Sequence, residues 1–304
     1  MLAISTAWNY DGFLSIQRML REIKEAGFDT IEVGYNFTAE KLEELIALIS
    51  DFDMKVVSIH NFCPLPPKPK IKRHFFDYYR ISSLDETERK KAVDYTKRTI
   101  DTAKRLLCKA IVIHAGTVEL EGDYIKDLIQ LYKEGKNNTP KYHNLKEKFL
   151  KMRSDKKQPY LESTIKSLDE ITSYAYKVGV KVGLETRYYP NEIPNIEEIE
   201  YLLSLFGNKG LVYWHDVGHA EVNERLGISL HINYLAKFKE QIFGIHIHDL
   251  IGINDHLAPF SGDFDFSKIA PYLSNENLIK VIEAHSQAKL KQIKEAKKRL
   301  LDLE

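Results

Sequence analysis

Acidic and histidine side chains close several apolar stretches of this sequence, and four of them form a candidate metal-binding set. The four are Glu185, Asp216, His246 and Glu283, and each ends a stretch that is typical of a buried strand. A carboxylate in that position is costly to bury unless a cation or hydrogen-bond donors accompany it. Mixed carboxylate and imidazole ligands suit a divalent metal such as Mn²⁺, Mg²⁺, Co²⁺ or Zn²⁺. Taken singly, each residue could equally cap a helix or lie hydrogen-bonded in the core, so the prediction depends on the whole set.

Further histidines follow the ends of the apolar stretches. In DVGHA, residues 216–220, His219 follows Asp216 by three residues, so a tight turn would bring both side chains to one mouth. We expect His219 to contact substrate, with a second metal site or a helix cap as the alternatives. The other candidates for a second metal or for substrate contacts are His60, His114 and His256.

The segment HIHD, residues 246–249, contains two histidines, and either of them could be the metal ligand. Alternation along a strand sends His246 and His248 to one face and Asp249 to the other. The pattern of residues alone therefore does not decide which histidine binds the metal.

Two residues are candidates for holding the substrate. Arg187 lies two residues after Glu185, on the same side of the chain, and its guanidinium could grip a phosphate or carboxylate with two hydrogen bonds. The equally simple alternative is an ion pair that orients Glu185. Trp8 follows the first predicted strand and is a candidate for stacking on a sugar, with core packing as the alternative.

Short apolar strands that alternate with amphipathic helices must position these residues. Strands are expected at residues 2–6, 28–33, 55–60, 109–114, 181–185, 210–216, 243–249 and 278–285, and helices at 13–27, 38–52, 85–107 and 161–178. This alternation predicts an α/β fold, a (β/α)8 TIM barrel with parallel strands buried on both faces. Because the strand ends of such a barrel open into one mouth, residues far apart in the sequence converge there.

Two long segments depart from the repeat, and both follow predicted strand ends. One is the Pro-rich stretch 63–80, and the other is the charged, amphipathic stretch from about 117 to 158. We expect a single domain over residues 1–304 in which 117–158 is a lid-like insertion after strand four or an oligomer contact.

Composition limits the partners. Lys and Arg number 44, as do Asp and Glu, and a net charge of zero argues against nucleic acid. Two cysteines without a CxxC motif indicate a reduced, cytoplasmic protein. The sequence lacks a run of about 18 apolar residues, so no membrane partner is expected.

Seven segments resemble the xylose-isomerase-like TIM barrels, the superfamily of sugar phosphate isomerases, epimerases and endonuclease IV. They are EAGFDTIEV, SIHNFCPLP, IVIHAG, GLETR, HDVGHA, IHIHD and VIEAH. The resemblance to the epimerase-like members implies one metal bound by Glu185, Asp216, His246 and Glu283, with His246 as the histidine ligand. It also implies that the two glutamates exchange a proton with the substrate and that His219 contacts the substrate.

Resemblance to endonuclease IV implies a different chemistry. That group binds three zinc ions with additional ligands, for which His60, His114, His219 and His256 are the candidates here. This chain departs from its Asp-any residue-His pattern, because the matching stretch is Asn254-Asp255-His256.

Two activities follow from these resemblances. The first is a metal-dependent isomerase or epimerase that moves a proton of a small sugar, sugar phosphate or polyol through an enediolate. The alternative is a multi-metal hydrolase, and a barrel that binds without catalysis is a third hypothesis. About one metal per chain would favour isomerisation, whereas two or three would favour hydrolysis. The expected partner is a small carbohydrate-like molecule, and a homo-oligomer remains open.

Overall fold

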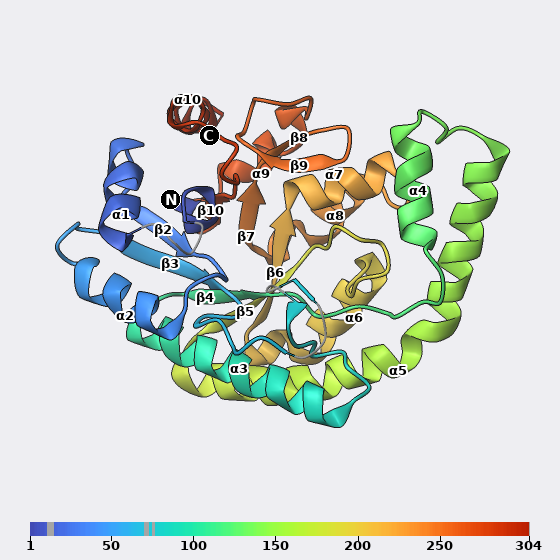
Figure 1. The fold of residues 1–304 in the computed structure, drawn as a ribbon, viewed down its shortest axis with the longest axis horizontal. Helices are drawn as coiled ribbons and strands as arrows, with labels where there is room; N and C mark the ends of the chain where they lie inside the picture. The colour runs from blue at the N-terminus through green and yellow to red at the C-terminus, as the bar shows by residue number, and fades with distance from the viewer. Residues whose placement is uncertain (11–14, 70–72, 75–76, 304) are drawn as a thin grey trace.

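The computed structural model describes all residues except 11–14, 70–72, 75–76 and 304, and the described chain forms a closed barrel of eight parallel strands (Figure 1). This is the predicted α/β TIM barrel, and each predicted strand is present. Around the barrel the order is β1-β10-β7-β6-β5-β4-β3-β2. The strands are β1 Leu2–Ser5, β2 Thr30–Val33, β3 Lys55–His60, β4 Ala110–Ile113, β5 Lys181–Glu185, β6 Leu211–Asp216, β7 Ile242–Ile247 and β10 Ile279–Ile282.

Helices surround the barrel, and several of them begin where a side chain accepts a hydrogen bond from a free backbone N–H group. Ser15 accepts from Arg18 at the start of the first helix, and Thr38 accepts from Lys41 at the start of the second. The beginning predicted for the first helix, at Phe13, and part of the Pro-rich stretch lie outside the described residues. The helices around the barrel are α1 Ile16–Glu25, α2 Ala39–Leu48, α3 Glu86–Arg105, α6 Ile196–Phe206, α7 Val217–Arg225, α8 His231–Phe238, α9 Ala270–Leu273 and α10 Leu290–Leu301.

The insertion after β4 consists of two helices, α4 Tyr124–Lys133 and α5 Pro140–Val178. The prediction of a separate helix beginning near residue 161 was wrong. One helix of 39 residues runs from Pro140 to the barrel, and Pro159 lies inside it. Its first turns pack against α4 in an apolar cluster apart from the main core, formed by Leu128, Leu131, Tyr142 and Phe149. The pair therefore stands out at one side of the barrel (Figure 1).

After β7 the chain leaves the barrel and forms a short antiparallel hairpin, β8 Asp249–Ile251 and β9 Asn254–Leu257. The prediction had continued the seventh strand through Asp249. Instead, the Asp249 carboxylate accepts hydrogen bonds from the backbone of Gly262 (2.7 Å) and Phe264 (3.0 Å), which anchors the following loop. Asp249 is thus committed to the loop rather than to the barrel mouth.

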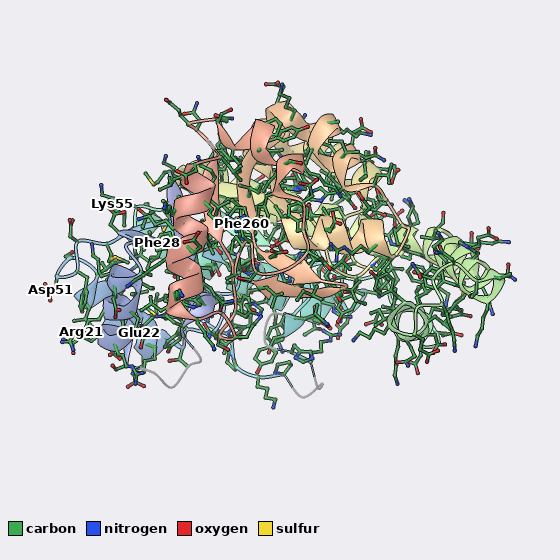
Figure 2. All side chains as sticks on the ribbon, turned by 90° about the horizontal axis from the view of Figure 1, so that it is seen from above. Arg21, Glu22, Phe28, Asp51, Lys55 and Phe260 are labelled. Carbon is green, nitrogen blue, oxygen red and sulfur yellow. The ribbon has the colours of Figure 1, made fainter. Side chains whose placement is uncertain are left out.

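The barrel interior is filled by Trp214 beneath the mouth. A Cβ atom on Gly183 would lie 2.8 Å from the indole, and one on Gly244 would lie 2.4 Å from it, so both positions must lack a side chain. Outside the barrel, α10 lies beside Phe28 and Phe260 (Figure 2). Lys297 lies over the ring of Phe28 and Arg299 over that of Phe260. None of the helices in the described chain is long and apolar enough to cross a membrane.

Candidate metal centre

The four predicted ligands meet at the mouth of the barrel. One ligand atom from each of Glu185, Asp216, His246 and Glu283 lies within 4.8 Å of the other three, and all four residues are buried. Nδ1 of His246 lies 2.7 Å from Oε1 of Glu185, 3.0 Å from Oε2 of Glu283 and 3.6 Å from Oδ2 of Asp216. Three carboxylates from different strands therefore converge on one imidazole nitrogen.

The charge of this cluster fits a cation. Burial lowers the pKa of His246, but Glu283 and Glu32 outweigh burial, so the pKa of His246 lies well above its ordinary value. Burial likewise raises the pKa of Glu185, but hydrogen bonds from His114 and His246 outweigh it and hold that pKa well below its usual range. A proton on His246 thus balances part of the carboxylate charge. A divalent cation between these four residues would balance it better, because a metal would face all three carboxylates.

His248 does not compete for this position. Its Nε2 lies 3.0 Å from Oδ1 of Asp216, and its Nδ1 accepts a hydrogen bond from the backbone N–H of His256 (2.9 Å). His248 thus contacts Asp216, but it falls with His219 and His256 in a second group of possible ligands rather than with Glu185 and Glu283. Asp216 also caps α7 by accepting the backbone N–H of His219 (2.7 Å). The geometry therefore favours His246 over His248 as the candidate ligand, and Asp216 both caps a helix and belongs to the cluster.

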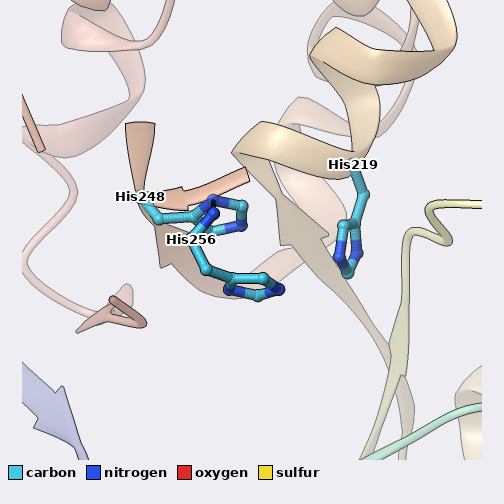
Figure 3. Close-up of side chains that lie close together, drawn as sticks. All are labelled: His219, His248 and His256. Carbon is cyan, nitrogen blue, oxygen red and sulfur yellow. Dashed lines mark hydrogen bonds between the residues drawn. The ribbon is translucent and has the colours of Figure 1, made fainter. Parts of the chain in front are cut away.

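A second set of possible ligands lies beside the first. Figure 3 shows His219 of α7 facing His248 and His256, whose rings are stacked with centroids 4.1 Å apart. His219 donates from Nδ1 to the carbonyl of Thr186 (3.0 Å), and His256 from Nδ1 to the carbonyl of Glu283 (2.9 Å). Their Nε2 atoms then carry lone pairs.

Asp255, which was not predicted to be a ligand, lies against these two nitrogens. Its Oδ2 lies 3.5 Å from Nε2 of His219 and 3.6 Å from Nε2 of His256. His256 has a positive φ of 55°, which breaks the alternation of the hairpin strand and lets two neighbouring side chains serve one site. The Asn254-Asp255-His256 stretch that seemed to break a motif therefore still supplies a carboxylate next to the histidines.

The remaining histidine candidates lie on the other side of Glu185. Oε2 of Glu185 lies 3.0 Å from Nε2 of His114 and 3.9 Å from Nε2 of His60. Arg187 donates to this same oxygen through Nη1 and holds Glu192 through Nη2 (3.0 Å). The arginine therefore forms the ion pair considered from the sequence, and it already supplies a positive charge on this side of Glu185.

A cavity of about 360 Å³ opens above these residues. Glu185, Glu283, His219 and Arg187 line it among the predicted residues, together with His60, His114 and His256. Tyr35, Tyr188, Asp255 and His285 also line the cavity. Burial, together with Glu283, raises the pKa of Tyr35, which keeps its phenol protonated.

Trp8 is absent from the described residues that line this cavity. It ends the short 3₁₀ turn Thr6–Trp8, lines a different hollow with Arg18 and Glu22, and donates its indole N–H to the carbonyl of Ala288 (2.8 Å). The turn after β1 directs the indole away from the mouth, so the predicted substrate contact by Trp8 finds no support in its position.

Comparison with known proteins agrees with this architecture. The chain is 24% identical to the uncharacterized protein MJ1614 of Methanocaldococcus jannaschii over 293 residues. The aligned segment covers 94% of this chain and 93% of that protein. Its fold is similar to that of 3-keto-D-glucoside 4-epimerase YcjR from E. coli, with a TM-score of 0.69, 16% identity and coverage of 99% and 98% of the two chains. It is also similar to the IolI protein with a bound zinc atom, with a TM-score of 0.65, 15% identity and coverage of 99% and 97%. Residues 20–303 match the model of one family over nearly the whole sequence, and the chain therefore belongs to the xylose isomerase-like TIM barrel family.

Proposed function

We propose that this protein is a divalent-metal-dependent isomerase or epimerase of a small sugar or related polyol. The observation that carries the proposal is the convergence of Glu185, Asp216 and Glu283 on Nδ1 of His246. Two of these carboxylates, Glu185 and Glu283, line the cavity, where a substrate carbon could lie between them. The similar folds of a sugar epimerase and of a zinc-binding protein support this choice of chemistry.

The side chains divide the work of proton transfer. A divalent metal, when bound by the four residues, supplies the positive charge that acidifies a C–H next to a carbonyl and stabilises an enediolate. Glu185 and Glu283 come from β5 and from the residue after β10, so they approach the cavity from different strands. One carboxylate removes the proton and the other returns it to the substrate. The neutral phenol of Tyr35 can donate a hydrogen bond to a substrate oxygen in the same cavity.

The test is the exchange of substrate hydrogen with solvent. The metal-loaded protein in deuterium oxide should incorporate deuterium into at least one sugar of a panel of ketoses and keto-sugars. Glu283→Gln should lower that exchange by about 10² to 10⁴-fold, since it removes a proton-transfer group. Glu240→Gln, which changes an exposed carboxylate in the turn before β7, is the matched control and should exchange at the wild-type rate. Full exchange by a folded Glu283→Gln protein would contradict the assignment.

A second candidate function is hydrolysis by several metal ions. His219, His256 and Asp255 favour it, because two lone pairs and a carboxylate oxygen face one another at 3.5 and 3.6 Å. The guanidinium of Arg187 disfavours a further metal between His60, His114 and Glu185, since it already pairs with Oε2 of that glutamate. The metal content of the purified, metal-loaded chain separates the functions: about one ion favours isomerisation, and two or three favour hydrolysis.

A further inference from the structure

A fourth carboxylate, Glu32, lies inside the barrel beneath the metal centre, and the proposed reaction gives it no role. Glu32 is in the middle of β2 and is completely buried. Its Oε1 and Oε2 lie 3.1 Å and 3.2 Å from Nε2 of His246. Ser58 of β3 donates to Oε2 of Glu32 (2.7 Å). A carboxyl group without access to water must find hydrogen-bond partners in the protein, and Glu32 finds them in Ser58 and His246.

We infer that Glu32 is a positioning residue that fixes the tautomer and the ring orientation of His246 for metal binding. The inference rests on the metal centre of the proposed function, but it concerns how that centre is held rather than which reaction follows.

The two nitrogens of His246 face opposite partners. Nδ1 faces Glu185 and Glu283, where a metal ion would need its lone pair. The ring proton of the neutral imidazole must then be on Nε2, and Glu32 is the acceptor in line with it. A carboxylate that accepts the second ring N–H of a ligating histidine makes the other nitrogen a stronger donor to the metal.

The backbone holds Glu32 in place for this contact. Glu32 and Ser58 are register partners on neighbouring strands, and the pairing of β2 with β3 shifts register between Ile31 and Glu32. The shift brings the serine hydroxyl beside the carboxylate. Because Ser58 donates to Glu32, it fixes the carboxylate and leaves the second oxygen to His246.

Aromatic packing also restricts the orientation of the His246 ring. The experiment must therefore separate the effect of the Glu32 charge from the effect of the size of its side chain. The indole of Trp214 lies edge-on to it at 5.4 Å between centroids, and the ring of His60 stacks at 6.1 Å. These contacts would hold the ring plane without Glu32, but they cannot choose which nitrogen carries the proton. Glu32→Gln keeps the size of the side chain and removes its charge, whereas Glu32→Ala removes both.

The experiment measures metal affinity on the full chain after metal removal, with Co²⁺ and Zn²⁺ as the probes and a chelating indicator as competitor. We expect Glu32→Gln and Glu32→Ala to weaken binding by about 10 to 100-fold and Ser58→Ala to weaken it less. The visible spectrum of bound Co²⁺ should also shift in both Glu32 variants, since it reports the ligand field and is insensitive to general packing. The matched control is Glu221→Gln, which removes the carboxylate 3.2 Å from another buried histidine, His231, outside the barrel and should leave Co²⁺ affinity and spectrum unchanged.

Each outcome decides the inference. A folded Glu32→Gln protein that binds Co²⁺ with wild-type affinity and spectrum would overturn it. If both Glu32 variants fail to fold, Ser58→Ala decides, and an unchanged affinity and spectrum would again overturn it. If metal binding to the chain depends on Glu32 but the wild-type chain exchanges no sugar hydrogen, the proposed function is disproved and the role of Glu32 stands. A wild-type chain that takes up neither metal would overturn both.

Discussion

Strand β6 supplies two buried clusters of histidine and carboxylate, one on each side of the barrel wall. Asp216 points into the mouth, where it joins the metal centre. Tyr213 and His215, which alternate with it along the strand, begin a chain of hydrogen bonds against α8. The histidines and carboxylates of both clusters are buried, and both clusters contain a histidine in contact with a glutamate. They differ in what balances their charge.

In the outer cluster, each side chain contacts the next in a chain that ends at an ion-paired carboxylate. The hydroxyl of Thr186 lies 2.6 Å from that of Tyr213, which lies 2.8 Å from Nδ1 of His215. Nε2 of His215 lies 3.0 Å from Nε2 of His231, whose Nδ1 meets Glu221 at 3.2 Å. The carboxylate at the end of this chain also pairs with Lys268 (3.0 Å) and Arg225 (3.1 Å).

The inner cluster is balanced differently. Glu32, Glu185 and Glu283 all contact the imidazole of His246, and Arg187 compensates Glu185. A proton on His246 compensates the remaining negative charge of these carboxylates, and a metal ion can replace that proton. Burial and histidine content are thus common to both clusters, and the contact of several carboxylates with one imidazole distinguishes the inner one as the candidate site.

The largest expected effect is on the outer cluster. Burial raises the pKa of Glu221, but His231 and Lys268 outweigh it and lower the pKa from 4.5 to about 2. The ionised carboxylate therefore stabilises the fold fully above pH 4.5, and this stabilisation is lost as the pH falls through about 2. Glu221→Gln should lower the free energy of unfolding by about 3 kcal/mol at pH 7 and by much less near pH 2 to 3. Urea unfolding of both proteins at the two pH values is the measurement, and equal stability at pH 7 would show that the outer cluster does not support the fold.

The inner cluster should respond to metal instead. At a free metal concentration of 100 times Kd, binding should stabilise the fold by about 2.7 kcal/mol, and a chelator should remove that increment. The raised pKa of His246 adds a direction: its proton stabilises the metal-free fold below about pH 6.5, and that stabilisation is lost as the pH rises through the raised pKa. The metal-free chain should therefore weaken toward alkaline pH, and the difference between metal-loaded and metal-free chains should widen.

Thermal unfolding with and without chelator, at neutral and alkaline pH, measures this difference. Glu221→Gln should show the same metal-dependent increment as the wild-type chain, because its carboxylate lies outside the barrel. If the chelator-sensitive stabilisation were to change in Glu221→Gln, the two clusters would be coupled, and the distinction between them would be wrong.

The sequence predicted the strands well because each is a short apolar run closed by polar residues, and it predicted the four converging residues because they lie at those ends. The structure now gives their distances, while their roles as ligands stay a prediction. Glu32 was not predicted to lie at the metal centre because it is in mid-strand. The sequence of a strand that is buried on both faces does not show which residues point inside. Asp255 escaped because the left-handed conformation of His256 is not visible in the sequence.

The helical insertion teaches a similar lesson. A proline usually ends a helix, so a boundary before residue 161 was reasonable. Tertiary contacts override it: Arg153, buried in α5, donates to both carboxylate oxygens of Glu198 at 2.8 Å and ties the helix to α6 on the N-terminal side of Pro159. Whether α4 and α5 act as a lid stays a prediction.

The smallest expected effect tests the outer chain at its middle. Tyr213→Phe removes the hydroxyl that lies between Thr186 and His215 and leaves two buried polar groups without that partner. The cost should be about 2 kcal/mol of unfolding free energy, since each of the two lost buried hydrogen bonds contributes about 1 kcal/mol. Co²⁺ affinity should stay at the wild-type value, because Tyr213 points away from the mouth. Thr186 makes this a demanding control, since its carbonyl accepts the ring N–H of His219. A change in Co²⁺ affinity would mean that the outer chain orients the mouth through Thr186, and the two clusters would then be one functional unit.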